Sequence, residues 1–488
     1  MPGSMPPFAH VVVLMFENRS FDHLFGAFPG ANGLLDANGN LKPDIYNLDD
    51  PTNPPPSDPA HTHYPQPITP DDELVHDCFH DFTGMMPELF GPGCAGWVAG
   101  APLSAPSPTW PASNAGFYSA AAYNVDPSGQ TPNGPPSMTY YQHGSLQVLH
   151  SLAAQFVLCD NWFCDVPGDT LLNRFFMHAA TADGELDDSQ GSVIDVPTIY
   201  DAITAQGATW KMYVPFAEVD GKIVGNGQID SRFFPSTQDS PCTNRPVTEL
   251  AADLKAGTLP SYSFVMCWLP KAAGGWPQDA ETSMHPVSDI RSGENYLAAV
   301  YHALRCSKAC WENTLLVVTF DENGGLYDHV PPPPAPAPVP GTAPATFRDP
   351  NRNIETSFDY TLLGPRIPAL LISPWLSPGV ASGQYQNSSI LRLVHDLFGT
   401  APLTARDAAA PPLDGVFAQF GLQAPRQGCP LSFPTYGGFP YAAGDLSQTY
   451  VPPAGAEAAV AAQPPHVRQP MAEMARIYDQ AGPTPGAA

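Results

Sequence analysis

The run His10 to Phe16, which reads HVVVLMF, decides the fold class of this chain. A continuous apolar run rich in valine is typical of a β-strand that is buried on both faces of a sheet. Two similar runs follow much later in the chain, Thr314 to Phe320 (TLLVVTF) and Ile367 to Ile372 (IPALLI). We therefore predict that these three runs are strands of one central sheet.

Segments with helical periodicity lie between and after the strands. They are Ser145 to Phe156, Gly293 to Leu304 (GENYLAAVYHAL) and Ser389 to Phe398 (SILRLVHDLF). Buried strands that alternate with amphipathic helices are typical of an α/β fold. The sequence therefore predicts a mainly parallel central sheet flanked by helices.

Proline-rich segments and the C-terminal part suggest how the rest of the chain is arranged. We predict that long proline-rich loops cover the catalytic edge of the sheet: Pro51 to Pro59, Pro132 to Pro136, and Pro331 to Pro340. From about Ala401 onward the chain is rich in Ala, Pro and Gly. We expect one catalytic domain over residues 1–400, and a C-terminal extension over residues 401–488 that wraps the same domain.

The charge of the chain excludes one class of partner. The formal net charge is −27, with only 20 Lys and Arg residues, and no basic stripe is available to follow a nucleic-acid backbone. We therefore expect no nucleic-acid binding. The same acidity repels anionic substrates at long range. A phosphate site in this chain would need its own local positive charge, most simply a metal ion.

The hydropathy pattern bears on membranes and export. No run of eighteen apolar residues is present, so a transmembrane segment is not expected. The N-terminus lacks a basic stretch followed by an apolar one, so no signal peptide is expected in this chain either. The compartment and the oligomeric state are not predicted from these features.

Polar residues follow two of the predicted strands directly. Glu17 and Asn18 come after the first run, and Asp321 and Glu322 come after the second. Because the carboxyl ends of parallel strands lie at one edge of a sheet, these residues are expected to meet there. Carboxylate and carboxamide oxygens are ligands that suit a divalent cation. The competing interpretations are a helix cap with a turn for the first pair, and a solvated acidic loop for the second.

A third motif is PGDTLLNRFFMHAA, in which Thr170 precedes a predicted helix. A hydroxyl at a helix N-terminus lies near unpaired backbone N–H groups that attract phosphate. Thr170 would serve equally well as a simple N-cap. Asn173 is expected on the same side of the helix, where it would donate to a phosphoryl oxygen. Arg174 is expected either to do the same or to form a structural salt bridge.

Together these motifs resemble one phosphoesterase family, which contains bacterial phospholipases C, plant non-specific phospholipases C and some bacterial acid phosphatases. The resemblance rests on ENRSFDH near the N-terminus, GDTLLNR in the middle and TFDENGGLYDHVPPP later, and it extends over LLGPRIPALLISPW and SSILRLVHDLF. It covers roughly residues 9–400. The resemblance implies an alkaline-phosphatase-like α/β fold.

The resemblance also implies roles for individual residues. Thr170 matches the family's nucleophile, a hydroxyl residue that also coordinates the metal, and Asn173 matches a residue near the phosphate. The residues that match the remaining metal ligands are Glu17, Asn18, Asp321 and Glu322. Residues that match histidine-containing motifs of the family are His80 (with Asp77, in a DxxH pattern), His285 (in an HP motif) and His329 (in a DHV motif).

Three positions depart from the family pattern. Asn323 stands where the family often has a histidine, Ser288 stands where some members have a second histidine after the HP motif, and Asn387 stands where a histidine is also frequent. These differences concern substrate preference and the chemistry of the leaving group more than the core reaction.

The sequence thus leads to a hypothesis for the reaction. A single divalent metal ion (Ca²⁺, Mg²⁺, Mn²⁺ or Zn²⁺) activates Thr170, which attacks the phosphorus and forms a phospho-threonine intermediate. Asn18 and Asn173 stabilise the phosphoryl oxygens, and His285, His80 or His329 protonates the leaving alcohol. The expected substrate is a phospholipid, which would involve peripheral membrane contact, or a small phosphoester. The alternatives are an acid phosphatase acting on monoesters and an inactive scaffold or binding protein.

Overall fold

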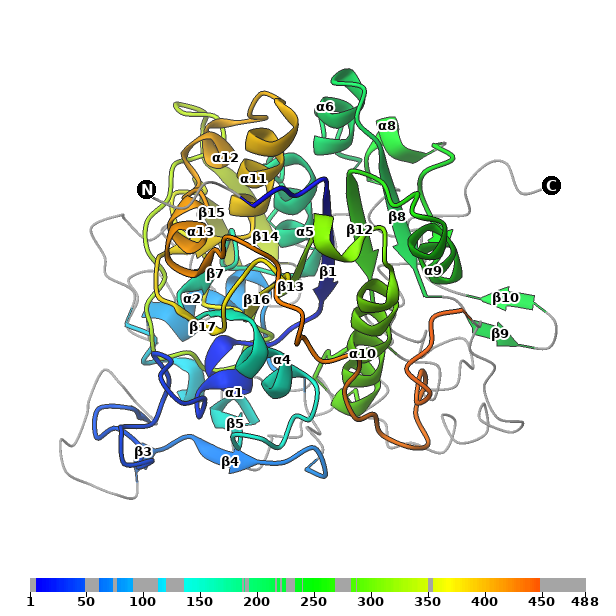
Figure 1. Ribbon diagram of the computed structural model, residues 1–488. Coiled ribbons are helices and arrows are strands. Elements are labelled where there is room, and N and C mark those ends of the chain that lie inside the picture. The colour runs from blue at the N-terminus through cyan, green and yellow to red at the C-terminus, as the bar shows by residue number, and fades with distance from the viewer. Residues whose placement is uncertain are drawn as a thin grey trace.

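Strand β1 (His10–Phe16) lies in the interior of the central sheet, as the sequence predicts. It pairs in parallel with β12 (Tyr262–Met266) on one side and with β13 (Thr314–Phe320) on the other. Every residue of β1 except His10 is buried, and so is every residue of β13. The apolar runs therefore form strands because both of their faces are covered (Figure 1).

The computed structural model describes residues 6–48, 61–72, 77–90, 113–119, 136–186, 188, 193–215, 217–219, 222–224, 233–238, 240–267, 282–286, 288–349 and 354–447. The proline-rich segment Pro51 to Pro59 lies outside these residues, as does Pro132 to Pro136 apart from its last residue. The segment Pro331 to Pro340 lies within them, and its backbone pairs with residues 361–363.

The central sheet has eight strands among the described residues. In spatial order they are β11 (Arg245–Pro246), β8 (Trp210–Val214), β12, β1, β13, β16 (Ala369–Ile372), β6 (Val157–Cys159) and β17 (Gly379–Ala381). Only β16 among them runs antiparallel to its neighbours. The prediction of a mainly parallel sheet is therefore confirmed. The third predicted strand, β16, runs in the opposite direction to β1 and β13. Its N-terminal end therefore lies at the edge where β1 and β13 have their carboxyl ends.

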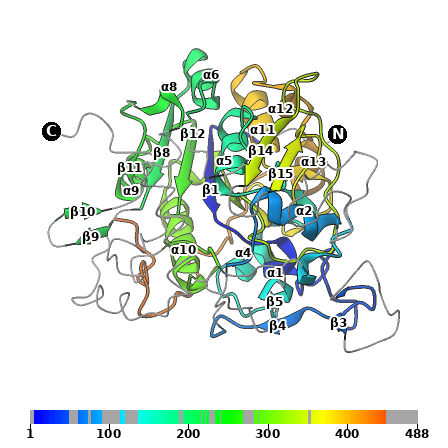
Figure 2. The same cartoon turned by 180° about the vertical axis from the view of Figure 1, so that it is seen from behind.

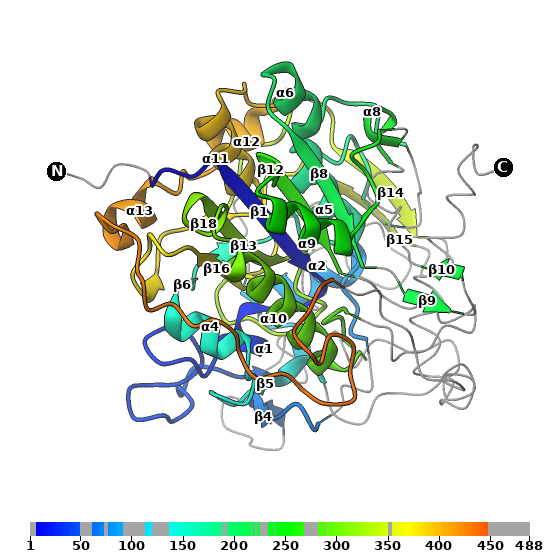
Figure 3. The ribbon, with the colours of Figure 1, turned by 45° about the vertical axis from the view of Figure 1, so that its right-hand side comes forward.

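Helices cover both faces of this sheet. The helices α4 (Leu149–Gln155), α9 (Val247–Ala256) and α10 (Ile290–Cys306) lie on one face, toward the viewer in Figure 3. On the other face lie α5 (Thr170–Ala179), α6 (Ile199–Ala205), α11 (Ser388–Phe398) and α12 (Ala405–Ala409), and Figure 2 shows the molecule from behind. The flanking helices predicted from the sequence are thus confirmed as α4, α10 and α11. No helix of the described chain is long and apolar enough to cross a bilayer.

The remaining elements are short. The helices among them are α1 (Phe21–Phe25), α2 (Phe82–Phe90), α8 (Pro235–Gln238), α13 (Asp414–Phe420), and two 3-10 turns at Pro136–Met138 and Trp311–Asn313. The strands form two-stranded pairs: β2 (Asn47–Leu48) with β3 (Thr62–His63), β4 (Gln66–Ile68) with β5 (Thr139–Tyr141), β7 (Trp162–Phe163) with β18 (Tyr385–Gln386), β9 (Ala217–Val219) with β10 (Lys222–Val224), and β14 (Ala345–Asp349) with β15 (Ile354–Phe358).

The described part of the C-terminal extension makes polar contacts with the rest of the chain. Asn295 of α10 donates to the carbonyl of Tyr436 at 2.9 Å, and Tyr301 of α10 donates to the carbonyl of Pro430 at 2.6 Å. Arg406 of α12 is fully buried, donates to the carbonyl of Pro336 at 2.8 Å and packs over a ring of α5. The boundary at residue 400 stays a prediction, and residues 448–488 lie outside the described residues.

One buried histidine makes the stability of the fold sensitive to acid. His150 of α4 donates from Nε2 to the carbonyl of Leu24 at 2.8 Å and accepts at Nδ1 from the N–H of Gly144 at 2.9 Å. A proton on Nδ1 would face another N–H group. Burial lowers the pKa of His150 to about 4, although the Leu24 carbonyl acts in the opposite direction. The neutral ring is therefore the form that the fold accommodates.

We expect the free energy of unfolding to fall by about 3 kcal/mol through His150 alone as the pH drops from 6.5 to 4. The sign follows because the unfolded chain binds this proton at a higher pH than the folded chain does. Urea unfolding at pH 6.5 and pH 4 measures the loss, which should be smaller in His150→Gln. The control is His302→Gln, because the partly exposed ring of His302 lies on the surface of α10. Equal losses in wild type and His150→Gln would contradict the prediction.

Candidate active site

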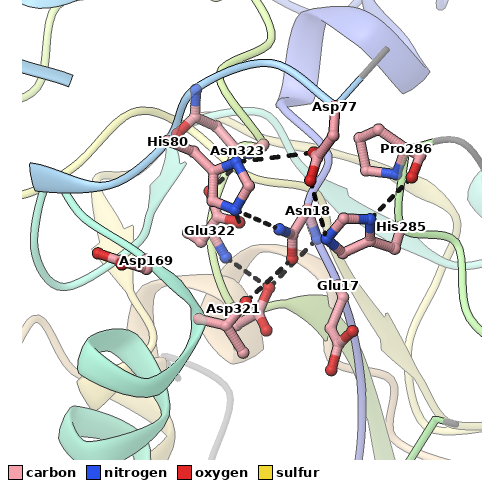
Figure 4. A network of polar contacts seen from close by, with 12 residues as sticks. Glu17, Asn18, Asp77, His80, Asp169, His285, Pro286, Asp321, Glu322 and Asn323 are labelled. Atoms are coloured by element: carbon pink, nitrogen blue, oxygen red, sulfur yellow. Dashed lines mark hydrogen bonds and ion pairs between the residues drawn. The ribbon is translucent and has the colours of Figure 1, made fainter. Parts of the chain in front are cut away.

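The polar residues that follow β1 and β13 come together at one edge of the sheet, as predicted. The two strands are in register, with Phe16 opposite Phe320, and the N–H of Asp321 donates to the carbonyl of Phe16 at 3.1 Å. A second bond joins the same two segments, because the N–H of Asn18 donates to Oδ1 of Asp321 at 3.2 Å. The strand register therefore places Glu17 and Asn18 beside Asp321 (Figure 4).

Asn18 has a backbone conformation that is unusual for a residue with a side chain. Its φ is 60°, in the left-handed region, where asparagine is better tolerated than most residues. This conformation directs its carboxamide between two other groups. Oδ1 accepts a hydrogen bond from Oγ1 of Thr170 at 3.3 Å, and Nδ2 lies 3.0 Å from Nε2 of His80. Asn18 therefore links the strand ends to Thr170 on one side and to a histidine on the other.

Thr170 is the first residue of α5, and it is buried. Thr170 follows β6 in the sequence, and β6 ends at Cys159, at the same edge of the sheet where β13 ends. Asp188 holds this helix end, because its Oδ1 accepts from the N–H of Leu171 at 2.9 Å. The structure thus brings the predicted nucleophile to this edge of the sheet, where it contacts Asn18.

Asn173 lies three residues further along α5, and its side chain is engaged with the loop before the helix. Nδ2 donates to the carbonyls of Val166, Gly168 and Asp169 at 3.2, 2.9 and 3.2 Å, and Oδ1 accepts from the N–H of Val166 at 3.1 Å. These bonds fix the turn that presents Thr170. A direct contact between Asn173 and substrate stays a prediction.

Arg174 forms a buried bridge between two of the predicted metal ligands. Its Nη2 lies 3.0 Å from Oε1 of Glu17, and its Nε lies 3.0 Å from Oδ2 of Asp321. The guanidinium therefore compensates part of the negative charge at the strand ends. The sequence suggested two roles for Arg174, a structural salt bridge or a contact with substrate. The contacts show the salt bridges, and substrate binding by Arg174 stays a prediction.

The acidic side chains of this edge lie in a buried place where their ionisation is unfavourable unless a cation compensates it. Glu322 is fully buried, its Oε2 accepts from the N–H of Gly324 at 2.5 Å, and its Oε1 has no hydrogen-bond partner among the described residues. Burial raises the pKa of Glu322 well above its usual value, and the charge of Asp321 adds to this effect although His80 opposes it. Burial also raises the pKa of Asp321, against the influence of Arg174. A buried pair of this kind fits a cation at the site.

Two of the predicted histidines lie on the other side of Asn18, together with Asp77. His80 places Nε2 3.9 Å from Oε1 of Glu322, and His285 places Nε2 3.9 Å from Oδ2 of Asp77. Burial opposes protonation of His80, but the carboxylates of Glu322 and Asp77 outweigh it and raise its pKa to about 9. Burial lowers the pKa of His285, although Asp77 acts in the opposite direction. His80 and His285 therefore adjoin the predicted site, as Figure 4 shows.

His329 belongs to a different polar cluster. Its Nδ1 lies 2.6 Å from Oδ2 of Asp22, and its Nε2 lies 3.3 Å from Oδ1 of Asn32. Arg366, which lies just before the antiparallel strand β16, pairs with Asp22 at 3.0 Å and with Asp328 at 2.8 Å. The hydrogen bonds and ion pairs of His329 thus lead to this cluster and not to Thr170, so its role as a proton donor stays a prediction.

The three departures from the family pattern are all buried. Asn323 donates to the carbonyl of Leu326 at 3.1 Å, and Asn387 donates to the carbonyl of Phe320 at 3.0 Å while it accepts from Trp162. Asn387 therefore supports the end of β13, and Asn323 supports the loop that follows it. Oγ of Ser288 has no hydrogen-bond partner among the described residues.

Gly324 lets the loop after β13 approach Asn18 closely. Its φ is +66°, and a Cβ at this position would lie 2.6 Å from the carbonyl oxygen of Asn18. We expect Gly324→Ala to displace Asn18 and to lower kcat by about 100-fold, because small misplacements of catalytic groups have effects of this size. Steady-state kinetics on a chromogenic phosphodiester measures the change.

Gly341→Ala is the matched control for this prediction. Gly341 has a φ of +82°, but nothing lies within 4 Å of the position that its Cβ would take. The control should therefore lose only about 1 kcal/mol of stability from the left-handed backbone and keep its kcat. If Gly324→Ala lost no more activity than Gly341→Ala, the close approach to Asn18 would not matter for catalysis.

Sequence analysis did not identify Asp188, which shapes this site. Asp188 holds the N-terminus of α5 from a separate loop, and its local sequence gives no sign of this contact. Asp77 was identified only as part of a family-like pattern, and its position between His80 and His285 depends on the fold.

Comparisons with known proteins identify the family of this chain. A model described as the Phosphoesterase family matches residues 8–401. Non-specific phospholipase C5 of Arabidopsis thaliana is 28% identical over 439 residues, which cover 87% of this chain and 76% of that protein. Phospholipase C B of Mycobacterium tuberculosis is 29% identical over 455 residues, which cover 85% and 78% of the two chains.

Among solved structures, a protein in the alkaline phosphatase superfamily from Vibrio parahaemolyticus aligns with a TM-score of 0.32 and 15% identity, over 55% of this chain and 64% of that chain. An alignment with this score carries no argument about this chain. The family model, in contrast, spans most of the chain, including Thr170 and both strand-end pairs. The chain therefore belongs to the Phosphoesterase family and is a phosphoric ester hydrolase.

Proposed function

We propose that this chain hydrolyses the phosphodiester bond of phospholipids as a phospholipase C does, with Thr170 as the nucleophile and a divalent cation as cofactor. One observation carries the proposal. The hydroxyl of Thr170 is directed at the carboxamide of Asn18, 3.3 Å away, at the edge where the carboxylates of β1 and β13 meet. The two relatives named above are both phospholipases C, which supports a phosphodiester as the substrate.

The residues proposed as ligands suit a divalent cation. They are all oxygen donors: the carboxylates of Glu17, Asp321 and Glu322, the amide oxygen of Asn18 and the hydroxyl of Thr170. Such a set favours Mg²⁺, Ca²⁺ or Mn²⁺ by ligand hardness, and Zn²⁺ also accepts carboxylate ligands. Oε1 of Glu322, buried and without a hydrogen-bond partner among the described residues, is a donor for such an ion. A cation held there would lower the pKa of the Thr170 hydroxyl and polarise the phosphoryl group.

The side chains of the site then have separate roles in the reaction. Oγ1 of Thr170 passes its proton to solvent and attacks the phosphorus, so a new P–O bond to Thr170 forms while the P–O bond to the leaving alcohol breaks. Asn173 holds the turn that presents this oxygen, and Arg174 holds Glu17 and Asp321 in place. Water then releases the phosphorylated head group from Thr170.

The leaving alcohol needs positive charge or a proton as its bond breaks. His80 is joined directly to Asn18, whereas His285 is joined to the site through Asp77. We therefore infer that the group of Asp77, His80 and His285 supplies this charge, and not His329. A protonated His80 is the simplest source of this positive charge.

A comparison of two chromogenic substrates tests the choice of a phosphodiester. We expect kcat/KM for p-nitrophenyl phosphorylcholine to exceed that for p-nitrophenyl phosphate by at least about tenfold, since a diester lacks the second negative charge that this acidic chain would repel. Both rates are measured on one metal-loaded preparation. A preference for the monoester would instead support an acid phosphatase, and no turnover of either would support an inactive scaffold.

A further inference from the structure

Arg19 is buried beside the candidate active site, and the reaction described above gives it no role. It follows Asn18 directly in the sequence, and it is only 1% exposed. Its backbone N–H donates to the carbonyl of Glu322 at 3.0 Å, which joins Arg19 to the loop after β13. Burial of a guanidinium is costly unless its N–H groups meet acceptors. The acceptors that Arg19 uses therefore indicate what its burial achieves.

Two of these acceptors belong to the segment that carries His285. Nε of Arg19 donates to the carbonyl of Met284 at 2.5 Å, and Nη2 donates to the carbonyl of His285 at 3.3 Å. Both bonds come from one rigid, planar group. They therefore fix the distance and the orientation of this segment relative to Asn18, which lies next to Arg19 in the chain.

The ring of His285 takes its orientation from the backbone of the same segment. Nδ1 lies 2.8 Å from the carbonyl of Pro286, and the backbone N–H of His285 donates to Oγ of Ser283 at 3.0 Å. Nε2 faces Oδ2 of Asp77 at 3.9 Å, as Figure 4 shows. A shift of the carbonyls that Arg19 holds would therefore move the ring of His285 away from Asp77.

A second buried histidine holds the other end of the guanidinium. Nη1 of Arg19 lies 2.9 Å from Nε2 of His23, and Nδ1 of His23 lies 2.9 Å from the carbonyl of Thr139. Burial and the charge of Arg19 lower the pKa of His23 well below its usual value, although the Thr139 carbonyl acts in the opposite direction. The ring is therefore neutral, with its hydrogen on Nδ1 and with a lone pair on Nε2 that accepts from Arg19.

We propose that Arg19 is a positioning residue that holds the imidazole of His285 beside the active site, and that His23 fixes the plane of the Arg19 guanidinium. Arg19 acts through the backbone carbonyls of Met284 and His285. The consequence for catalysis rests on the proposed function, in which Asp77, His80 and His285 supply positive charge to the leaving alcohol. The positioning itself can be tested without measuring activity.

Chemical modification of the full-length protein tests the positioning. Diethyl pyrocarbonate acylates accessible neutral imidazoles, and mass spectrometry of the digested protein gives the rate at each histidine. His285 is only 3% exposed. We expect it to be modified at least about tenfold faster in Arg19→Gln than in the wild type, because its segment opens more often. His302, which is partly exposed on α10, is the internal reference, and its rate should not change.

Arg406→Gln is the matched control. Arg406 is also fully buried and also donates to backbone carbonyls, among them that of Pro336 at 2.8 Å. Its acceptors do not include the segment of His285. Arg406→Gln should therefore leave the modification rate of His285 unchanged. Circular dichroism and thermal unfolding show whether each variant folds.

Kinetics on two esters then shows whether the positioned imidazole acts on the leaving group. Phenyl phosphorylcholine has a more basic leaving oxygen than p-nitrophenyl phosphorylcholine, so its cleavage depends more on a proton or positive charge. We expect Arg19→Gln to lower kcat about tenfold more on the phenyl ester than on the nitrophenyl ester. Arg19→Gln should add little to the loss in His285→Gln, because the two residues act as one unit. Arg406→Gln should change both rates by the same factor.

The outcomes separate this inference from the proposed function. A folded Arg19→Gln in which His285 is modified no faster than in Arg406→Gln would overturn the positioning role. Faster modification of His285 with an equal loss on both esters would support the positioning and overturn the part of the proposed function that assigns His285 to the leaving alcohol. If Arg19→Gln does not fold, Arg19→Lys decides the question in the same way, because lysine keeps the charge but lacks the planar fork that bridges the two carbonyls.

Discussion

Replacing Thr170 by valine is expected to lower kcat on p-nitrophenyl phosphorylcholine by about three to six powers of ten, on the order of 4–8 kcal/mol of activation free energy. Valine keeps the shape of threonine but has no hydroxyl, so the oxygen that attacks phosphorus is gone while the helix N-terminus stays filled. The substitution removes only one side-chain hydrogen bond of Thr170, the one to Oδ1 of Asn18.

Thr170→Ser is the matched variant for this prediction. Serine retains the hydroxyl at the start of α5, so we expect it to keep a kcat within about 100-fold of the wild type. Thermal unfolding of both variants shows whether α5 still packs, since every residue of this helix is buried. A Thr170→Val enzyme that folded normally and turned over at nearly the wild-type rate would show that another group attacks the phosphorus.

Removal of the proposed cation is expected to have the second-largest effect. Treatment with a chelator should abolish activity. Added divalent metal should restore activity in the wild-type enzyme but not in the Asp321→Asn variant. Loss of a residue that merely supports a metal ligand costs about 10- to 100-fold in metal affinity, so loss of the ligand itself should cost more than about 100-fold. Metal content after dialysis and activity against added metal measure the two effects.

Asp328→Asn is the control for Asp321→Asn. Both aspartates are fully buried, and each pairs with an arginine, Asp321 with Arg174 at 3.0 Å and Asp328 with Arg366 at 2.8 Å. Both variants should therefore lose stability, because each leaves a buried arginine with one fewer anionic partner. Only Asp321→Asn should lose the metal. Equal metal content in the two variants would contradict the assignment of Asp321 as a ligand.

The core of the fold could be predicted because its strands carry an unambiguous signal. The runs at His10–Phe16 and Thr314–Phe320 are buried on both faces, so every position is apolar or nearly so, and no helical period competes. The neighbour of β1 on its other side, β12, was not predicted, because its sequence YSFVM is short and carries polar hydroxyls. The direction of β16 could not be predicted either, since an apolar run has the same composition whichever way the strand runs.

The convergence of the polar residues after β1 and β13 could be predicted from the same strands. A parallel pair places the residues that follow each strand at one edge, so Glu17 and Asn18 were expected beside Asp321 and Glu322. Their role as metal ligands follows from the family resemblance and stays a proposal. The surroundings could not be predicted, because they depend on contacts between distant loops. The hydrogen bonds of Asn173 with residues 166–169 depend on the path of one such loop.

Analysis of the enzyme quenched in acid during turnover tests whether Thr170 is the nucleophile. Thr170 becomes covalently phosphorylated if it attacks the phosphorus at the edge where the strand-end oxygens meet. Mass spectrometry of the digested protein should then show the transferred phosphoryl group on the peptide that contains Thr170, and not in Thr170→Val. A transferred group on a histidine or on any other residue, during normal turnover by the wild type, would contradict this account.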